Sequence, residues 1–216
     1  MPRGEDIVED EQLTVFDEYG KRIGSAARKE VHRIGLWHET FHCWLASAFE
    51  GTDYLYIQKR SHLKKDYPGL LDITAAGHLL LGETVADGVR EVEEELGISI
   101  PFSSLTSLGS VKYSAVFGDF IDNELARLYI GRCPHTFAPF HLQKEEVSGL
   151  LRVRFSDFAS LWAGERTVIQ AEGFEMDGEG GRSDIHIQAE RKDFVPHEQS
   201  YYEAVINRIG HFLEKP

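Results

Sequence analysis

The feature that most constrains this chain is an acidic run, residues 77–98, with glycines near both of its ends. If the second half of the run is helical, Glu91, Glu94 and Glu95 recur at helical spacing and share one face. The opposite face is apolar and consists of Val85, Val89, Val92 and Leu96. Like charges this close destabilise an isolated helix, so a positive partner is expected, and Mg²⁺ is a cation that prefers oxygen ligands. The run therefore predicts an amphipathic helix whose charged face binds a divalent cation.

The same residues resemble the signature of the Nudix hydrolases. That signature is a glycine, five residues, a glutamate, seven residues, and the string Arg-Glu-apolar-any-Glu-Glu-any-Gly-apolar. Gly77, Glu83 and the string from Arg90 to Ile98 match it, except that six residues instead of seven separate Glu83 from Arg90. A deletion inside a helix would rotate its faces by about 100°. Because the apolar spacing is unbroken from Val85 onward, we place the missing residue in the loop before the helix, where it affects Glu83 rather than the later glutamates.

This resemblance implies an α/β fold in which a mixed β-sheet lies between helices as an α/β/α sandwich. It also implies a Mg²⁺ or Mn²⁺ cofactor bound by Glu91, Glu94 and Glu95, with Glu83 as an additional candidate. Glu91 or Glu94 would act as the general base, and Arg90 would hold a glutamate through bidentate pairing. For the run alone, the alternative is a solvated amphipathic helix, and the matching glycines and arginine favour the metal site over it.

Three further segments resemble the isopentenyl diphosphate isomerase branch of the Nudix superfamily and its hydrolase relatives. They are residues 36–41, residues 67–73 with the pair at 77–78, and residues 122–125. In the isomerases, histidines and two glutamates at such places bind a metal beside a catalytic cysteine. His38, His78 and Glu124 match that site, and Asp122 stands where a glutamate is usual. These four residues are therefore candidates for an additional site.

Two differences from the isomerases concern that site. Another histidine of the isomerases would align with Val31, whereas this chain has a histidine one position later, at His32. The isomerase cysteine would precede the Gly-His pair, where this chain has Ala76. Isomerisation needs a proton donor and a proton acceptor on opposite faces of an alkene, and an alanine side chain is neither. Because Cys43 and Cys133 lie elsewhere in the sequence, we expect hydrolysis rather than isomerisation.

The expected function is metal-dependent hydrolysis of the diphosphate linkage in a nucleoside diphosphate derivative. An isopentenyl diphosphate isomerase is one alternative, and a non-catalytic nucleotide-binding regulator is another, which the shortened spacing keeps open. For His38, His42 and His78 the alternative is a structural role in the core. Asp122 and Glu124 lie two positions apart, so on a strand they face the same side and add carboxylates to a cleft.

The composition limits the kinds of partner that the protein is expected to bind. A formal net charge of −13 argues against nucleic acid, and the expected partner is a small diphosphate substrate whose charge a metal offsets. No apolar run approaches the ~20 residues of a membrane span, and the first residues lack a signal-peptide apolar region. The two cysteines make no disulfide framework. We therefore expect a cytoplasmic protein without a membrane partner. Lys59-Arg60 and Lys64-Lys65 are candidates for phosphate contact, and Glu145-Glu146 are expected in a solvated turn.

The 216 residues are expected to form one domain with extensions. We divide the chain into a flexible segment 1–11, a Nudix domain 12–163, and a C-terminal extension 164–216 that packs on the same domain. The extension would serve as a lid, as a dimer arm, or only to cover the domain. The oligomeric state stays open, and the C-terminal extension is compatible with a homodimer. Strands are expected near residues 13–16, 37–49, 54–58, 71–74, 107–116, 124–132, 147–155, 167–175 and 184–190. Ser156 and Asp157 are expected to cap a helix that ends near Trp162, a glycine-rich turn is expected at 177–181, and Pro196 is expected to precede a last helix.

Overall fold

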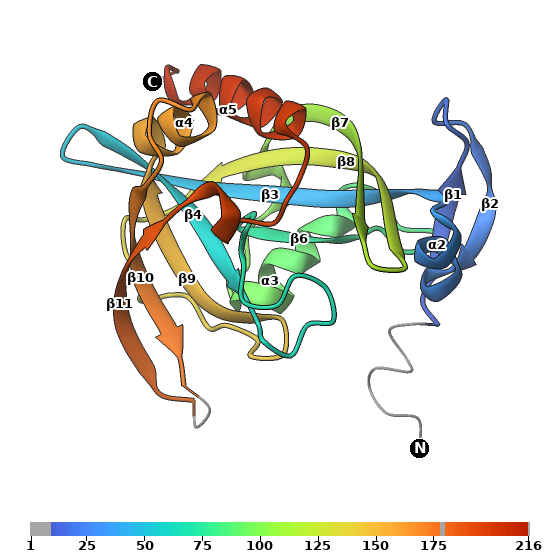
Figure 1. The fold of residues 1–216 in the computed structure, drawn as a ribbon, viewed down its shortest axis with the longest axis horizontal. Helices are drawn as coiled ribbons and strands as arrows, with labels where there is room; N and C mark the ends of the chain where they lie inside the picture. Colours follow the sequence, from blue (N-terminus) through green and yellow to red (C-terminus); the bar gives the residue numbers. More distant parts are fainter. Residues whose placement is uncertain (1–9, 178–179, 216) are drawn as a thin grey trace.

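A computed structural model describes residues 10–177 and 180–215, in which a single eleven-stranded sheet forms the body of the protein (Figure 1). The strands are β1 (Gln12–Phe16), β2 (Arg22–Ala27), β3 (Trp37–Phe49), β4 (Thr52–Arg60), β5 (Leu71–Asp72), β6 (Ala75–His78), β7 (Thr106–Phe117), β8 (Phe120–Arg132), β9 (Val147–Arg154), β10 (Ile169–Met176) and β11 (Arg182–Ala189). The α-helices are α2 (Arg28–Ile34), α3 (Arg90–Leu96), α4 (Phe155–Ala163) and α5 (Gln199–Leu213). Single 3-10 turns are η1 (Asp87–Val89), η2 (Phe102–Ser104) and η3 (Arg191–Asp193).

The sheet is mixed, as expected. Its main path runs β11-β10-β9-β4-β3-β1-β2, with β5, β6, β7 and β8 attached to its flanks. Strands β3 and β8 run parallel, and the other paired strands run antiparallel. Helices cover both faces: Figure 1 shows α4 and α5 on one side of β3, and α3 on the other. The α/β sandwich class is confirmed.

Strand β3 contributes to two hydrophobic cores, one on each face of the sheet, because successive side chains of a strand point to opposite faces. Trp44 and Ala46 belong to the core that α4 and α5 cover, whereas Cys43 and Leu45 belong to the core beneath α3. A hairpin joins β3 to the antiparallel strand β4. Its turn consists of Glu50 and Gly51, with φ angles of 48° and 75°, and two positive φ values are typical of the turn that matches strand twist.

Helix α3 is the helix expected from the acidic run. It begins at Arg90, directly after η1, and ends at Gly97, whose φ of 68° terminates it in the left-handed conformation. Val92 and Leu96 are buried, as the apolar face predicts. The residues between Glu83 and Arg90 form turns and a 3-10 turn, so the shortened spacing lies outside the α-helix.

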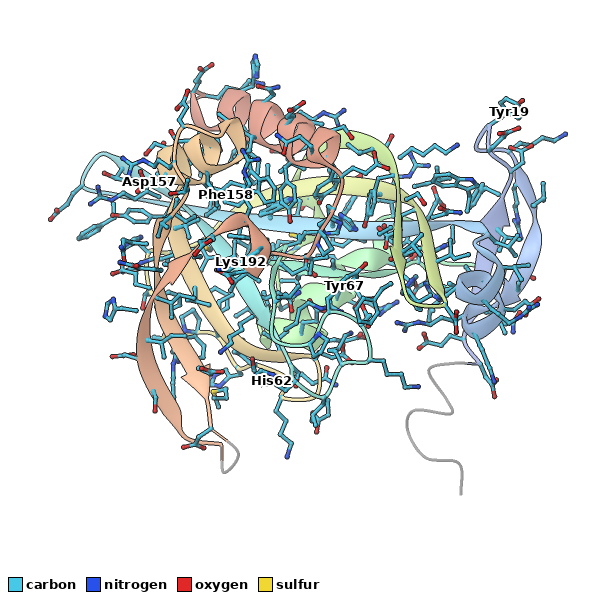
Figure 2. The ribbon with its side chains drawn as sticks, viewed as in Figure 1. Tyr19, His62, Tyr67, Asp157, Phe158 and Lys192 are labelled. Carbon is cyan, nitrogen blue, oxygen red and sulfur yellow. The ribbon has the colours of Figure 1, made fainter. Side chains whose placement is uncertain are left out.

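The C-terminal residues extend the same sheet and cover it. Strand β10 pairs with β9, and buried side chains of α5 share a core with β3 and α4. Buried Phe158 of α4 packs into this core, and Asp157 beside it is only half-buried (Figure 2). The division at residue 163 remains a prediction. No helix in the described part of the chain combines the length and apolar character needed to cross a membrane.

One expectation about the elements is wrong, and two elements were not predicted. The helix α4 begins at Phe155, and Arg154 at its N-cap makes no side-chain capping bond, so the expected cap by Ser156 and Asp157 is wrong. Both residues lie inside the first turn because β9 passes directly into the helix. Strand β2 and the seven-residue helix α2 were not predicted from the sequence. Residues 1–9 of the expected flexible segment and residues 178–179 of the expected turn lie outside the described residues.

Candidate functional site

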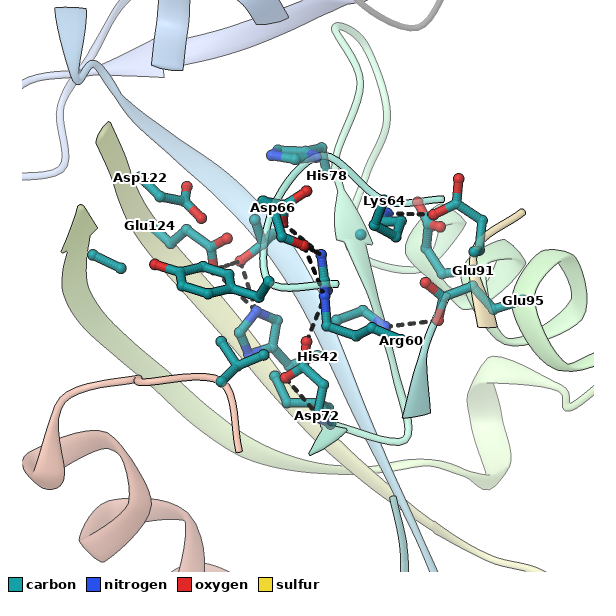
Figure 3. Close-up of a pocket in the computed structure, with 18 of the residues that line it drawn as sticks. His42, Arg60, Lys64, Asp66, Asp72, His78, Glu91, Glu95, Asp122 and Glu124 are labelled. Carbon is teal, nitrogen blue, oxygen red and sulfur yellow. Dashed lines mark hydrogen bonds and ion pairs between the residues drawn. The ribbon is translucent and has the colours of Figure 1, made fainter. Parts of the chain in front are cut away.

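A cavity of about 260 Å³ lies on the sheet between α3 and the segment that leads into α5 (Figure 3). Glu91, Glu94 and Glu95 of α3 line one end of it. Asp122 and Glu124 of β8 line the other end, as expected for two residues on one side of a strand. The cavity thus joins both groups of carboxylates that the sequence singled out, although the two groups come from separate elements.

Glu91 sits against Gly77, which explains the glycine at this position. A Cβ atom at Gly77 would lie 2.1 Å from the Glu91 Cδ atom, so a larger residue would displace the carboxylate. The Glu91 side chain is 12% exposed, and burial raises its pKa to about 7. The strand β6 therefore leaves a space that this carboxylate fills.

Glu95 and Glu94 complete the acidic face of α3. Glu95 is 6% exposed and accepts hydrogen bonds from the Ala76 N–H at 3.1 Å and the Gln58 Nε2 atom at 3.3 Å. Burial, reinforced by the negative charge of Glu91, raises the pKa of Glu95 well above its ordinary value. Glu94 is half exposed, with 52% of its side chain accessible. The three carboxylates concentrate negative charge that an oxygen-seeking cation would offset.

Arg90 holds several of these groups in place. It makes the expected bidentate pair with Glu83, with Nε–Oε1 and Nη2–Oε2 distances of 2.8 Å and 3.2 Å. Its Nη1 atom also lies 2.7 Å from Glu91 Oε1 and 2.9 Å from Glu94 Oε2, and Nη2 donates to the His78 carbonyl at 3.0 Å. Burial opposes ionisation of Glu83, but its bonds to Arg90 and to a backbone N–H lower its pKa overall. Glu83 does not line the cavity. Its contact is with Arg90.

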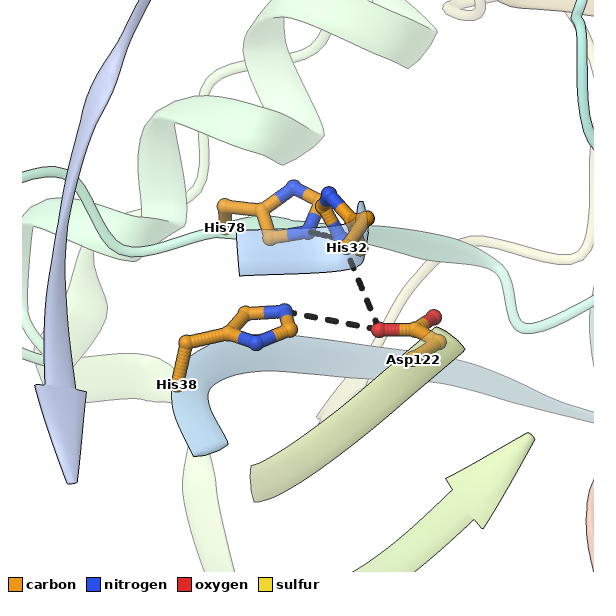
Figure 4. Close-up of side chains that lie close together, drawn as sticks. All are labelled: His32, His38, His78 and Asp122. Atoms are coloured by element: carbon orange, nitrogen blue, oxygen red, sulfur yellow. Dashed lines mark hydrogen bonds and ion pairs between the residues drawn. The ribbon is translucent and has the colours of Figure 1, made fainter. Parts of the chain in front are cut away.

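A second cluster consists of His32, His38, His78 and Asp122 (Figure 4). Ligand atoms of these four side chains all lie within 4.8 Å of one another. The Nε2 atoms of His38 and His32 lie 3.4 Å and 3.6 Å from Asp122 Oδ1, and the His32 and His78 Nε2 atoms are 3.1 Å apart. Burial lowers the pKa of all three histidines, which favours neutral imidazoles.

The donor set of this histidine cluster fits a cation. His38 and His32 direct Nδ1 to the carbonyl oxygens of Leu36 and Arg28, at 3.0 Å and 2.9 Å. In a neutral ring these bonds place the proton on Nδ1, so both Nε2 atoms face the cluster as lone pairs. Among the described residues, His38 Nε2 and Asp122 Oδ1 are also buried without a hydrogen-bond partner, which is costly unless a cation satisfies them.

The histidine cluster corrects the alignment made from sequence. Val31, where the isomerases would have a histidine, is buried in a small core with β1, and His32 is the residue of α2 that joins the cluster. Glu124 lies beside the cluster rather than in it. Its Oε2 atom accepts hydrogen bonds from Thr40 Oγ1 at 2.7 Å and Tyr113 OH at 2.6 Å, and it lies 3.0 Å from His42 Nε2.

The basic residues that were candidates for phosphate contact fall into two groups. Arg60 and Lys64 line the cavity, whereas Lys59 is outside its lining and bonds Glu175 at 2.7 Å. Arg60 is held by Asp66 and Asp72, at 2.5 Å and 2.9 Å. Glu145 and Glu146 lie in a turn, as expected, but Glu146 is only partly solvated, because it lines the cavity and pairs with Lys64. His197 and Val195, which were not predicted from the sequence, line the cavity from the C-terminal segment.

The position that holds cysteine in the isomerases is part of the cavity wall. Ala76 lines the cavity, whereas Cys43 and Cys133 do not. Cys43 is fully buried in the core beneath α3, and burial raises the pKa of both thiols to about 12. Neither thiol is therefore placed or ionised to serve at the cavity.

A mixed sheet that carries a glutamate-rich helix, fixed by an arginine–glutamate fork and a close glycine contact, defines a Nudix-type hydrolase. The NUDIX domain family model matches residues 37–171. An uncharacterized Nudix hydrolase of Clostridium acetobutylicum is 37% identical over 202 residues, which cover 94% of this chain and 98% of that protein. The chain belongs to the Nudix hydrolase family, which acts on phosphorus-containing anhydrides and generally uses divalent metals.

Other relatives agree with this family. Nudix hydrolase 3 of Arabidopsis thaliana is 33% identical over 80% of this chain, which spans only 23% of that longer protein. An isopentenyl-diphosphate Delta-isomerase of Mycolicibacterium vanbaalenii is 31% identical over 64% of this chain and 74% of its own length. Among solved structures, a Deinococcus radiodurans protein superposes with a TM-score of 0.54, 22% identity, and coverage of 71% of this chain and 90% of that one. The structural likeness supports the fold alone.

Proposed function

We propose that this protein hydrolyses the diphosphate linkage of a nucleoside diphosphate derivative with the help of Mg²⁺ or Mn²⁺. The observation that carries the proposal is the acidic face of α3, where three carboxylates line a cavity and Arg90 and Gly77 fix their positions. Glu91, Glu94 and Glu95 would hold the cation. A divalent cation bound there supplies charge neutralisation for phosphate oxygens and acidifies a bound water.

The remaining lining residues fit a substrate of this class. Arg60 and Lys64 lie between the two acidic ends of the cavity (Figure 3), where they would bind and orient phosphate oxygens. Tyr67 and Phe120 add aromatic surface suited to a base or another flat group. Glu91 is our candidate for the general base, because its largely buried carboxylate lines the cavity beside the proposed cation.

The histidine cluster would bind a second cation. Imidazole nitrogens with one carboxylate suit Mn²⁺ or Zn²⁺ better than Mg²⁺, and the buried lone pairs of His38 and Asp122 are the observation behind this assignment. At this end, the chain's own contribution is to orient the imidazoles through the backbone carbonyls that they bind.

The test is a screen of diphosphate compounds with Mg²⁺ and Mn²⁺, including isopentenyl diphosphate, in which the products are identified. The double variant Glu94→Gln/Glu95→Gln should abolish turnover while the protein stays folded. Glu93→Gln is the matched control, because Glu93 belongs to the same helix but is exposed and outside the cavity lining. Unchanged turnover in the double variant would refute the assignment.

The second candidate function is isomerisation of isopentenyl diphosphate. Isomerase relatives and the histidine cluster favour it, and Ala76 at the cysteine position opposes it. Proton exchange into the substrate, followed by NMR, would detect this reaction. Nucleotide binding without phosphate release would instead support a non-catalytic regulator. A cytoplasmic location and a homodimer remain predictions.

A further inference from the structure

The C-terminal helix α5 contacts His42, a residue that lines the cavity, through Tyr201. Tyr201 is fully buried, and its hydroxyl lies 2.9 Å from His42 Nδ1. The other ring nitrogen of His42, Nε2, lies 3.0 Å from Glu124 Oε2. A continuous chain of contacts therefore connects α5 to Glu124, although Tyr201 itself does not line the cavity.

The chemistry of the acceptor fixes the direction of this chain. Glu124 Oε2 already accepts hydrogen bonds from the hydroxyls of Thr40 and Tyr113, so this oxygen carries no proton and acts as an acceptor. The His42 Nε2 atom must carry a proton to make a favourable contact with it. In a neutral imidazole the other nitrogen is then a lone pair, and Tyr201 must donate its hydroxyl proton to Nδ1.

We infer that Tyr201 and His42 are positioning residues for Glu124: Tyr201 sets the tautomer of His42, and His42 orients the carboxylate beside the histidine cluster. This inference rests on the proposed function, because Glu124 lines the cavity in which hydrolysis is proposed to occur. The C-terminal segment then has a role at the site, beyond packing on the sheet.

The ring of Tyr201 and its hydroxyl can be tested separately. Aromatic rings of Tyr113, His197 and Tyr201 surround His42, with centroids 5.7–6.3 Å away. Tyr201→Phe keeps this packing and removes only the donor. Tyr202→Phe is a matched control, because Tyr202 is the next residue of α5, is equally buried, and loses a 2.8 Å hydrogen bond to the Val195 carbonyl.

The kinetic test compares these variants under metal-saturated conditions. Partners that orient a site residue typically contribute about 10–100-fold, so Tyr201→Phe should lower kcat about tenfold with little change in KM, and His42→Leu should lower it about 100-fold. His42→Gln keeps an N–H donor for Glu124 and should recover part of that loss. Tyr202→Phe should keep the wild-type kcat. Equal kcat values for the two tyrosine variants would overturn the inference.

A second readout is independent of turnover. In the metal-free protein, ¹⁵N NMR of the His42 ring should show a protonated Nε2 and an unprotonated Nδ1, and Tyr201→Phe should perturb these signals while Tyr202→Phe does not. A proton on Nδ1, or on both nitrogens, would contradict the assigned direction. If the wild-type protein hydrolyses no diphosphate, the proposed function fails, whereas the NMR comparison still decides the inference.

Discussion

The close contact between Gly77 and Glu91 leads to the most direct prediction. Replacing Gly77 by alanine would place the new Cβ atom 2.1 Å from Glu91 Cδ and 2.2 Å from its Oε1 atom. Gly77 does not have a left-handed backbone, so alanine fits the backbone of β6 without strain. The substitution therefore acts on the Glu91 carboxylate and not on the strand.

The size of the effect follows from the displacement. An ordinary contact between carbon atoms is about 3.5 Å, so the carboxylate must retreat by about 1.4 Å. A misplacement of about 1 Å at a reacting group costs about 100-fold in rate. We therefore expect Gly77→Ala to lower kcat/KM about 100-fold. The cost in the free energy of unfolding should stay near 1–2 kcal/mol, because the clash is with the end of one side chain.

The assay combines turnover, Mn²⁺ titration and urea unfolding for Gly77→Ala and a control glycine variant. Gly210→Ala is the control, because its Cβ atom would lie 3.7 Å from the Phe155 ring, an ordinary contact, inside helix α5. This control should keep its activity and gain about 0.5–1 kcal/mol of stability. Wild-type turnover and Mn²⁺ affinity in Gly77→Ala would show that Glu91 does not need its present position, which would refute the reasoning.

Three further predictions concern pH, cation binding and backbone conformation. Burial raises the pKa of Glu91 from its ordinary value of 4.5 to about 7, so the folded metal-free protein holds more protons than the unfolded chain between these values. Its free energy of unfolding should therefore fall by up to about 3.4 kcal/mol as the pH rises through this window. Glu91→Gln should flatten the slope measured by urea unfolding, and an unchanged slope would contradict the assignment. Asp122→Asn should weaken Mn²⁺ or Zn²⁺ binding at the histidine cluster at least about tenfold, as measured by calorimetry. The control Asp119→Asn changes a residue on the exposed turn between β7 and β8 and should keep the wild-type affinity. Equal affinities of the two variants would argue against a cation site at the cluster. Gly97→Ala combines a φ of 68° with a Cβ atom 2.5 Å from the His141 carbonyl oxygen, whereas Gly20→Ala has a φ of 78° and open space around its Cβ atom. Both variants should lose the ~1–2 kcal/mol of backbone strain from the free energy of unfolding. Only Gly97→Ala should lose more than that in unfolding experiments.

The parts of this protein that could be predicted from sequence depend on local spacing. Helix α3 was predictable because its two faces recur within single turns, and β3 was found with the predicted bounds, Trp37–Phe49. The resemblance to the Nudix signature implied that Arg90 holds a glutamate, and the structure pairs Arg90 with Glu83 and Glu94, which lie close to it in sequence. Such contacts follow from the geometry of one helix and the turn before it.

The parts that could not be predicted depend on contacts between distant residues. Helix α2 has only seven residues and two buried side chains, Val31 and His32, which is too little for an apolar period. Its packing beside β1 brings His32 to the histidine cluster. Tyr201 and His42 are 159 residues apart in sequence, and no local pattern records their contact. The folded chain reveals these partners because it brings distant segments together.

The shortened spacing between Glu83 and Arg90 illustrates where this fold tolerates change. The residues between them form turns and η1, which lack the continuous backbone hydrogen bonds of an α-helix. The loss of one residue there changes the path of a loop, but it leaves the faces of α3 and the Arg90–Glu83 fork intact. The same loss after Arg90 would turn Glu94 and Glu95 away from the cavity. The unusual spacing is therefore compatible with a complete acidic site.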